Sequence, residues 1–371
     1  MKILITGANG FIGKNLIWNL RSAGYEDILE CTRNTSPEEL HQKAEQCDFV
    51  YHLAGVNRPQ SVDEFETGNV DFTAMLCGLL SKRSKGGVPI VFTSSSQAAL
   101  NNPYGNSKRN AEEVIFSYGR SSNVPVYIYR LTNVFGKWSR PNYNSAVATF
   151  CHNIARGLPI TVTNPDLEMQ LIYIDDLVNE FMKLLKIPDS PSGHAVFPQK
   201  LIYCRTLGSI AQEIRGFHEC RKDLGLPNLA DPFVSRLYST YLSFLPQEEF
   251  SYPLNTHEDA RGSFTEFLRT VDRGQVSVNV TLPGITKGQH WHNSKNEKYL
   301  VVHGKAVIRF RKVYSDEIIE YPVSASRLEV VEIPTGYTHS IENVGDDELV
   351  TLMWANEPFD PLHPDTFHDE V

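Results

Sequence analysis

The order of strand-like and helix-like segments limits the fold of this chain more than any other feature. In the first half, short apolar runs at residues 2–6, 27–32, 48–54, 89–93 and 126–131 alternate with stretches of helical periodicity. A strand–helix–strand order places successive strands parallel in one sheet, with helices on both faces. We therefore expect a doubly wound α/β sheet in the first half of the chain.

The pattern changes near residues 244–246. A helix-rich stretch, 205–241, ends there, and short β-type runs follow at 276–281, 299–311, 318–321, 328–333 and 349–354. Short strands with Gly, Pro and Asp between them are typical of an antiparallel sandwich or barrel. A chain of 371 residues is long enough for two domains, so we expect an α/β domain over 1–245 and an all-β domain over 246–371.

Composition narrows the class of ligand and the compartment. The net charge is −9 and no long basic run occurs, which argues against a nucleic-acid partner but leaves room for a phosphate-bearing small molecule. No apolar run approaches about 18 residues, so we expect no membrane insertion. The six cysteines are scattered without a C-x-x-C pair, which indicates thiols in a reducing, cytoplasmic compartment.

A glycine-rich loop follows the first apolar run. It reads TGANGFIG over residues 6–13 and opens a helical stretch over 11–23. Glycines allow a tight turn and let the backbone approach a pyrophosphate, while the helix N-terminus supplies N–H donors. This context predicts a Rossmann-type dinucleotide site that uses Gly7, Asn9, Gly10, Phe11, Ile12 and Gly13.

The choice of nicotinamide cofactor depends on the end of the second apolar run. An NAD site usually carries an acidic residue about 20 residues after the glycines, where it binds the ribose hydroxyls. Arg33 stands there in this chain, and a guanidinium suits the 2′-phosphate of NADPH, which we therefore favour. The alternative is that Arg33 is a solvated surface charge and Glu30 binds the ribose.

Tyr104 and Lys108 form a candidate proton-transfer pair. Residues i and i+4 share one face of a helix, and a nearby ammonium is expected to lower the pKa of the tyrosine toward neutrality. Ten residues upstream of Tyr104, an apolar run ends in Thr93-Ser94-Ser95-Ser96, which offers a hydroxyl to polarise a carbonyl group.

Together with the glycine loop and His52-Leu53-Ala54-Gly55, these segments resemble the extended short-chain dehydrogenase/reductase family over about residues 1–245. The resemblance implies Ser94, Tyr104 and Lys108 as catalytic residues, and the ten-residue spacing to Tyr104 favours Ser94 over Ser95. It also implies cofactor contacts from Leu53, Ala54, Gly55, Tyr104 and Lys108. Segments 130–136 and 173–176 resemble nucleotide-sugar members, whereas the short segment between 27 and 48 lacks the family's usual third strand with its adenine-binding Asp.

Potential metal ligands are concentrated in the second half. His290 and His292 are two residues apart, so on a strand both can face a barrel interior. Segments 284–304 and 334–343 resemble the two cupin motifs, with one departure at Leu328, where the second motif begins with Gly. We expect a cupin (jelly-roll) barrel that holds one divalent metal through His290, His292, Glu297 and His339. Zn²⁺ is favoured over Fe²⁺, Mn²⁺ and Ni²⁺ because four N and O ligands suit its tetrahedral preference.

Residues 259–266, DARGSFTE, resemble a segment of nucleotide-linked 4-keto-sugar 3,5-epimerases, which are also cupins. In those enzymes the His of an R-G-x-H segment is the catalytic base, and Lys287-Gly288-Gln289-His290 takes that place here. We assign His290 to the metal, which leaves the base open among Tyr299, His303 and Tyr337.

The two halves together resemble the bifunctional enzymes of capsular-polysaccharide synthesis. The resemblance implies C3 epimerisation of a UDP-linked 4-keto-6-deoxy-N-acetylhexosamine in the second domain, then NADPH-dependent reduction of the C4 ketone in the first. It also implies UDP-N-acetyl-6-deoxy-talosamine as the product, on the route to N-acetyl-L-fucosamine, and a homodimer. In one alternative, the second domain is only a structural or dimerisation module of a nucleotide-sugar reductase. In another, it is a metal dioxygenase.

Overall fold

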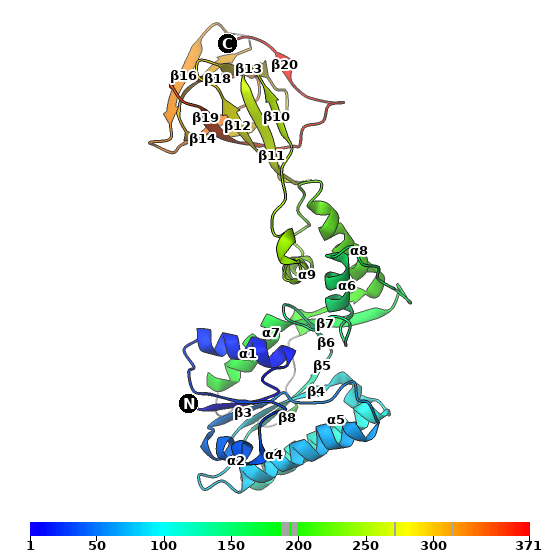
Figure 1. The fold of residues 1–371 in the computed structure, drawn as a ribbon. Helices are drawn as coiled ribbons and strands as arrows, with labels where there is room; N and C mark the ends of the chain where they lie inside the picture. Colours follow the sequence, from blue (N-terminus) through cyan, green and yellow to red (C-terminus); the bar gives the residue numbers. More distant parts are fainter. Residues whose placement is uncertain (187–192, 195–198, 271, 314) are drawn as a thin grey trace. The chain divides into compact units, whose positions relative to one another are not determined.

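The structure, a computed structural model, describes residues 1–371 apart from 187–192, 195–198, 271 and 314 (Figure 1). The chain forms two units, Met1–Arg215 with Ala230–Pro246, and Gly216–Leu229 with Gln247–Val371. The expected boundary between residues 245 and 246 stays a prediction, but the stretch Gly216–Leu229, which we expected in the first domain, groups with the second unit.

A six-stranded parallel sheet in the order β2-β1-β3-β4-β5-β8 forms the centre of the first unit. Its strands are β1 (Ile3–Thr6), β2 (Ile28–Cys31), β3 (Phe49–His52), β4 (Ile90–Ser95), β5 (Val126–Leu131) and β8 (Gly193–His194). The strand order reverses between β1 and β3, which confirms the doubly wound α/β sheet. β2 is an edge strand, in agreement with the missing extra strand between residues 27 and 48.

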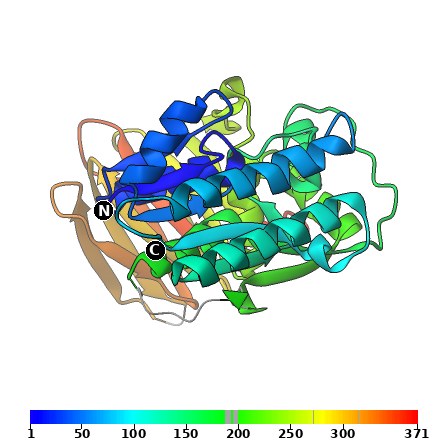
Figure 2. The same cartoon turned by 90° about the horizontal axis from the view of Figure 1, so that it is seen from below.

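Helices cover both faces of this sheet. Side chains of α1 (Phe11–Ser22) and α7 (Ile174–Lys183) share one apolar core with the strands, and those of α2 (Pro37–Gln46), α4 (Phe72–Ser81) and α5 (Pro103–Ser122) share a second. The two layers lie above and below the strands in Figure 1, and Figure 2 shows α4 and α5 side by side across the lower face.

A smaller sheet completes the first unit and contributes to its site. Its strands β6 (Asn133–Phe135), β7 (Glu168–Tyr173) and β9 (Ile202–Thr206) pair in the order β6-β7-β9. The remaining helices are α3 (Asp63–Phe65), α6 (Ala146–Ile154), α8 (Leu207–Cys220), α9 (Pro232–Leu242) and the short turns η1 (Glu66–Asp71), η2 (Ser96–Ala99), η3 (Leu184–Lys186), η4 (Gln199–Leu201) and η5 (Gln247–Glu249). No helix within the described ranges is long and apolar enough to cross a membrane.

Local sequence signals explain where the main helices begin and end. Ser36 caps α2 through a reciprocal pair of hydrogen bonds with Glu39, and Pro37 occupies the first helical position. Asn102 caps α5 by accepting the Gly105 N–H at 2.7 Å. The helix ends at Asn123, whose φ of 51° is the left-handed conformation that Asn tolerates. These caps fix α5, the helix that carries Tyr104 and Lys108.

The second unit consists of two antiparallel sheets. One has the order β10-β11-β12-β19-β14-β17, with strands Thr256–Asp259, Gly262–Thr270, Gly274–Thr281, Leu349–Ala355, Glu297–His303 and Val330–Ile333. The other has the order β16-β15-β18-β13-β20, with strands Ile318–Ser324, Lys305–Lys312, Tyr337–Asn343, Thr286–Trp291 and Phe367–His368. One apolar core joins both sheets, with Tyr299 and Ile333 from the first and Ile308 and Ile341 from the second. The expected all-β architecture is therefore confirmed.

Candidate active site and metal cluster

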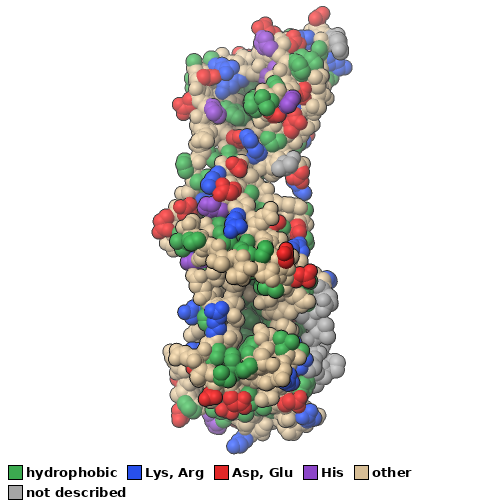
Figure 3. Space-filling model, turned by 90° about the vertical axis from the view of Figure 1, so that its right-hand side faces the viewer, with side chains coloured by type: hydrophobic (Ala, Val, Ile, Leu, Met, Phe, Trp, Pro, Cys, Tyr) green, Lys and Arg blue, Asp and Glu red, His purple; other side chains and the backbone are tan. Residues whose placement is uncertain are grey.

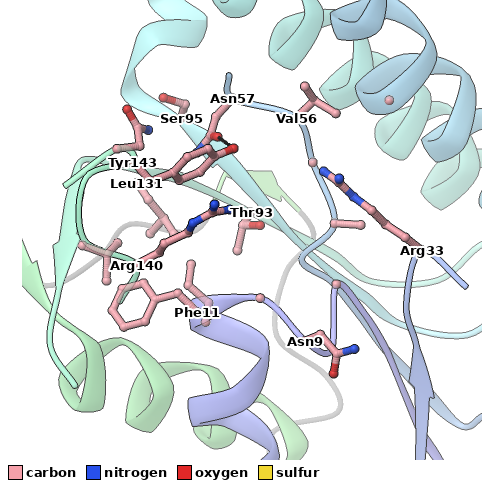
Figure 4. A pocket seen from close by; sticks show the side chains of 18 of the residues that line it. Asn9, Phe11, Arg33, Val56, Asn57, Thr93, Ser95, Leu131, Arg140 and Tyr143 are labelled. Carbon is pink, nitrogen blue, oxygen red and sulfur yellow. Dashed lines mark hydrogen bonds between the residues drawn. The ribbon is translucent and has the colours of Figure 1, made fainter. Parts of the chain in front are cut away.

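The first unit contains a cavity of about 1300 Å³ at the carboxyl ends of its parallel strands. Residues just after β1, β2 and β3 line it, together with the ends of β4 and β5. Figure 3 shows this face of the first unit hollowed, and Figure 4 shows the side chains around the hollow. In open α/β sheets, ligands bind at this edge, where the strand order reverses.

The glycine loop between β1 and α1 forms one wall of the cavity. Gly7 has φ +70°, and a Cβ there would come within 2.8 Å of the Ala54 backbone nitrogen. A Cβ on Gly13 would come within 2.3 Å of the Gly7 carbonyl oxygen, so only glycine lets α1 pack this closely against the loop. The close packing leaves the α1 N-terminus facing the cavity, as a dinucleotide pyrophosphate requires.

Most of the predicted cofactor residues meet at this cavity. Its lining includes Gly7, Asn9, Gly10, Phe11, Ile12, Arg33, Ala54, Gly55 and Tyr104. Three others, Gly13, Leu53 and Lys108, are not part of the lining. Gly13 supports the loop, and the Lys108 ammonium lies 3.6 Å from the place that a Cβ on Gly55 would take.

The cavity wall is positively charged. It carries Lys14, Arg33 and Arg140 and no Asp or Glu among the described residues that line it. In Figure 4 the side chains of Arg33 and Arg140 reach into the cavity from opposite sides. Glu30, the alternative ribose ligand, is not part of the lining, and its carboxylate accepts a hydrogen bond from Arg21 at 2.8 Å. This charge distribution suits a ligand with phosphate groups.

Ser94, the predicted catalytic serine, and Ser95 both line the cavity but have different partners. Ser94 is 5% exposed, and its hydroxyl donates to Glu112, which also accepts three hydrogen bonds from the Arg130 guanidinium. Ser95, the next residue, hydrogen-bonds Tyr104 through its side chain and lines the cavity, where Figure 4 places it. The alternation of side chains at the end of β4 gives the two hydroxyls different partners, and the contact with Tyr104 favours Ser95 as the hydroxyl next to the proton donor.

Tyr104 and Lys108 lie on α5 as predicted, but their acidities differ from the expectation. Burial raises the pKa of Tyr104 above its usual value, and the hydrogen bond from Ser95 offsets only part of that rise. Lys108 is 4% exposed; burial lowers its pKa to about 8. Its ammonium donates to the Thr93 carbonyl oxygen at 2.7 Å and lies 4.4 Å from the centre of the Phe92 ring. Tyr104 is therefore protonated at neutral pH.

The far end of the cavity holds residues that the sequence analysis did not select. The Tyr143 hydroxyl donates to the Asn57 side-chain oxygen at 2.9 Å, as drawn in Figure 4. The Arg140 and Arg58 guanidinium carbons lie 5.0 Å and 5.7 Å from the centre of the Tyr143 ring. Asn57 and Tyr143 are 86 positions apart in the sequence. No local sequence motif therefore indicates that these residues lie at one site.

In the second unit, the structure brings the four predicted metal ligands together. Ligand atoms of His290, His292, Glu297 and His339 all lie within 4.8 Å of one another. The Glu297 carboxylate lies 3.7 Å from His292 Nε2 and 3.5 Å from His339 Nε2. His339 is fully buried and His292 is 3% exposed. The four side chains come from β13 and the loop after it, β14 and β18.

A bulge in β13 aligns the first two ligands with the others. The pairing of β13 with β18 shifts between Gly288 and His290, and Gln289 at the shift has φ 61°. After the shift, His290 lies opposite His339, with the ring centres 4.5 Å apart. Residues directly opposite each other point to the same face of a sheet, so both imidazoles enter the sandwich together.

The donor set fits a divalent metal. Among the described residues, His292 Nε2 and His339 Nε2 are buried without a hydrogen-bond partner, and both lie within 4 Å of the Glu297 carboxylate, an arrangement that fits a metal ion between them. Burial and the two neighbouring imidazoles lower the pKa of His290 to about 4, so its ring is neutral at physiological pH. Burial opposes the charge on Glu297, but its contacts with His292 and His339 prevail and lower its pKa. Three imidazoles and one carboxylate are suitable ligands for Zn²⁺.

The three candidates for a catalytic base occupy different surroundings. The Tyr299 hydroxyl is buried and donates to Glu297 at 3.0 Å, and burial raises its pKa well above the usual value. His303 is exposed at the end of β14. Tyr337 is half-buried at the start of β18, with its ring edge-on to Phe310. Of the three, Tyr299 is the one that contacts a predicted metal ligand through its side chain.

Comparison with known proteins yields two family models and full-length relatives. The NAD dependent epimerase/dehydratase family matches residues 3–197, and the polysaccharide biosynthesis C-terminal domain matches residues 257–367. The chain is 46% identical over 99% of its length to the UDP-2-acetamido-2,6-beta-L-arabino-hexul-4-ose reductase of Pseudomonas aeruginosa, 98% of which is covered. It also matches the crystal structure of the capsular polysaccharide assembling protein CapF from Staphylococcus aureus, with 49% identity, a TM-score of 0.93 and 100% coverage of both chains.

More distant matches cover only part of the chain. MoeE5, solved in complex with UDP-glucose and NAD, has a TM-score of 0.52 and 19% identity over 58% of this chain, which shows a shared fold. The full-length matches to the P. aeruginosa reductase and to CapF cover both units. The chain therefore belongs to the NAD dependent epimerase/dehydratase family, within the group that also carries a polysaccharide biosynthesis C-terminal domain and includes CapF.

Proposed function

We propose that the first unit reduces the C4 ketone of a UDP-linked 4-keto-6-deoxy-N-acetylhexosamine with NADPH. The observation that carries the proposal is the cavity, which is lined by the glycine loop, Ser95 and Tyr104 and by the cations Lys14, Arg33 and Arg140. The 46% identity to a UDP-sugar 4-ulose reductase over nearly the whole chain supports this class of substrate.

Each residue of the proposed site has a separate task. Bound NADPH supplies the hydride for C4. Tyr104, whose pKa is raised by burial, keeps its proton at neutral pH and donates it to the oxygen of the former ketone. The Ser95 hydroxyl, which hydrogen-bonds Tyr104, stabilises the negative charge on that oxygen. Lys108 is anchored on the Thr93 carbonyl behind the cavity wall and places its charge beside the cofactor loop at Gly55.

The preference for NADPH over NADH rests on Arg33. Its guanidinium lies at the cavity where the 2′-phosphate of the cofactor is expected, while Glu30 is engaged with Arg21. NADPH should bind more tightly than NADH in a fluorescence titration, and Arg33→Ala should remove the difference. Equal affinities of the parent protein for the two cofactors would contradict this assignment.

The UDP group is assigned to the opposite end of the cavity. Arg140 is the cation that lines that end, and it lies over the ring of Tyr143, which in turn is held by Asn57. A guanidinium in this position can pair with a diphosphate through charge-assisted hydrogen bonds. The same cavity thereby accommodates two phosphate-bearing ligands, with Arg33 and Arg140 on opposite sides.

For the second unit we propose a metal-dependent C3 epimerase of the cupin type. The four clustered ligands and their two unpartnered imidazole nitrogens support a metal site, and we favour Zn²⁺. A metal at this place supplies positive charge to the oxygen of a 4-keto sugar, which makes the C3 hydrogen more acidic. Epimerisation at C3 followed by reduction at C4 leads to UDP-N-acetyl-6-deoxy-talosamine. We also propose that the protein assembles as a homodimer.

The test of the proposed reaction is the purified chain with a UDP-4-keto-6-deoxy-N-acetylhexosamine and NADPH labelled with deuterium at the reactive position. Deuterium should appear at C4 of the sugar as NADPH is consumed. Consumption of oxygen in the absence of NADPH would instead support a metal dioxygenase in the second unit. A failure to oxidise NADPH with this class of sugar would contradict the proposed reductase.

A further inference from the structure

Residues 364–371, called here the C-terminal strap, run along β13, which carries His290, and along the loop after it, which carries His292. Within the strap, β20 pairs with β13, with His368 opposite His290 and Phe367 opposite Trp291. The rings of Phe367 and Trp291 stack at 4.8 Å. The Asp369 and Val371 backbone N–H groups donate to the main-chain and side-chain oxygens of Gln289, the residue at the bulge.

At the other end of the strap, the Asp365 carboxylate holds the loop that follows His292. It accepts three consecutive backbone N–H groups, from Asn293 at 3.1 Å, Ser294 at 2.9 Å and Lys295 at 2.9 Å. The Ser294 hydroxyl adds a fourth hydrogen bond at 2.9 Å. Lys295 is 5% exposed, and its ammonium donates to the Pro364 carbonyl oxygen at 3.0 Å. Five hydrogen bonds thus fix residues 364–365 on this loop.

The backbone of Asp365 reaches the metal ligand itself. His292 Nδ1 lies 2.6 Å from the Asp365 carbonyl oxygen. Because a carbonyl oxygen only accepts hydrogen bonds, Nδ1 must carry the hydrogen atom, and in the neutral ring Nε2 then has a free lone pair. This is the nitrogen that faces Glu297 in the cluster. The contact therefore selects the tautomer and the ring orientation that metal binding needs.

The backbone of Asp365 adopts an unfavourable conformation where its carbonyl oxygen contacts His292. Its φ is +40°, a left-handed value that is uncommon for residues with a side chain. The carboxylate that accepts the three N–H groups of the loop offsets this strain. One residue thus links the position of the loop, through its side chain, to the orientation of His292, through its main chain.

We propose that Asp365 is a positioning residue for the metal site, which holds His292 so that Nε2 points at the metal. The proposal rests on the metal site proposed above and extends it to a residue 73 positions away from His292. Outer contacts of this kind usually change metal affinity by about 10–100-fold when they are removed. Asp365→Ala retains the carbonyl but loses the carboxylate that fixes it, so it should weaken metal binding by about that factor.

The test measures Zn²⁺ affinity of the full chain by competition with a chromophoric chelator. Asp360→Ala is the matched control, because its carboxylate is half-exposed and accepts only from Leu362 and His363, outside the metal loop. Asp365→Asn is the conservative variant, since its amide oxygen can still accept part of the loop's N–H groups. The parent protein and Asp360→Ala should bind Zn²⁺ with equal affinity. Asp365→Asn should bind it more weakly, and Asp365→Ala should bind it most weakly.

A second readout separates positioning from folding. In the Co²⁺-loaded protein, the visible absorption of the metal reports ligand geometry. Asp365→Ala should change this spectrum, whereas the metal-free variant should still unfold cooperatively, at a melting temperature below that of Asp360→Ala because four hydrogen bonds are lost. If Asp365→Ala does not fold, the Zn²⁺ affinity and the Co²⁺ spectrum of Asp365→Asn test the proposal instead. Zn²⁺ affinity and a Co²⁺ spectrum equal to those of the parent would overturn the role of Asp365 alone. A parent chain that binds no Zn²⁺ would overturn the metal site and this proposal with it.

Discussion

At the scale of single residues, the two serines at the end of β4 have different surroundings. Ser94 is buried against Glu112, whereas Ser95 contacts Tyr104 at the cavity. Ser95→Ala removes a donor to the developing negative charge and should lower kcat for ketone reduction by about 10²–10³-fold. Ser94→Ala should mainly reduce stability, because it breaks a hydrogen bond to a buried carboxylate.

These two variants are compared by steady-state reduction kinetics and thermal melting of the same samples. A larger loss of kcat in Ser94→Ala than in Ser95→Ala would contradict the assignment of Ser95. Circular dichroism of both variants provides the control for folding.

Lys108 should determine the alkaline limb of the pH profile. Burial lowers its pKa to about 8, so its ammonium is present below pH 8 and is lost as the pH rises through that value. The ratio kcat/KM reports groups of the free enzyme, and for reduction it should therefore decrease above about pH 8. Tyr104 does not cause this decrease, because burial raises its pKa.

The matched variant is Lys108→Arg, in which the charge persists at all accessible pH values. Its activity is expected to be lower, but the decrease above about pH 8 should disappear. A parent profile that stays flat from pH 7 to pH 10 would show that the Lys108 charge is not required.

At the scale of elements, the bulge of β13 is the feature on which the metal cluster depends. Gly288 has φ +96°, and a Cβ there would come within 2.7 Å of the His339 carbonyl oxygen. Gly284 has a similar φ of +73° but open space around its Cβ position. Gly288→Ala combines strain and a clash with a ligand-bearing strand, whereas Gly284→Ala has the strain alone.

Gly284→Ala should therefore destabilise the second unit by about 1–2 kcal/mol and retain the metal. Gly288→Ala should cost about 2–4 kcal/mol and also weaken Zn²⁺ binding, since His290 loses its position opposite His339. Denaturant unfolding and chelator competition measure the two effects. Equal losses of stability and of metal affinity in the two variants would show that the bulge is not important for the cluster.

The elements that the sequence predicted best are those with strong local signals. β5 has the predicted bounds, Val126–Leu131, because a parallel strand covered by helices on both faces is rich in apolar residues, and five of its six residues are buried. The predicted start of α2 is confirmed by the capping box of Ser36. The run expected at 299–311 is divided into β14 and β15 at Gly304, whose φ of +86° forms a turn. β10, β11 and β20 were not predicted, because their pairing depends on strands elsewhere in the chain.

The same contrast holds for the site residues. The glycine loop, Tyr104 and the four candidate ligands follow spacings that are visible in the sequence. Ser94 was favoured over Ser95 because the spacing to Tyr104 does not show the side-chain directions at the end of β4, which depend on the local strand geometry. Arg140 and Asp365 were missed because their contacts, to Tyr143 at the cavity and to His292 across 73 positions, arise only in the folded chain.

At the scale of the whole molecule, we propose one chemical step for each of the two units. The first unit has its own parallel sheet, apolar cores and cofactor cavity. The second has its own core between two antiparallel sheets and its own cluster of ligands. Each step should therefore survive the loss of the other, which distinguishes a bifunctional enzyme from a reductase with a purely structural second unit.

The most direct measurement is NMR of a UDP-4-keto-6-deoxy-N-acetylhexosamine in D₂O with the Tyr104→Phe variant, loaded with Zn²⁺. Deuterium should enter C3 without NADPH at the parent rate, because the variant changes only the first unit. After NADPH is added, reduction at C4 should be slower than in the parent by about 10²–10⁴-fold. His290→Ala should show the reverse, with C3 exchange lost and NADPH still bound. A parent protein that reduces the ketone but never exchanges the C3 hydrogen would contradict the account.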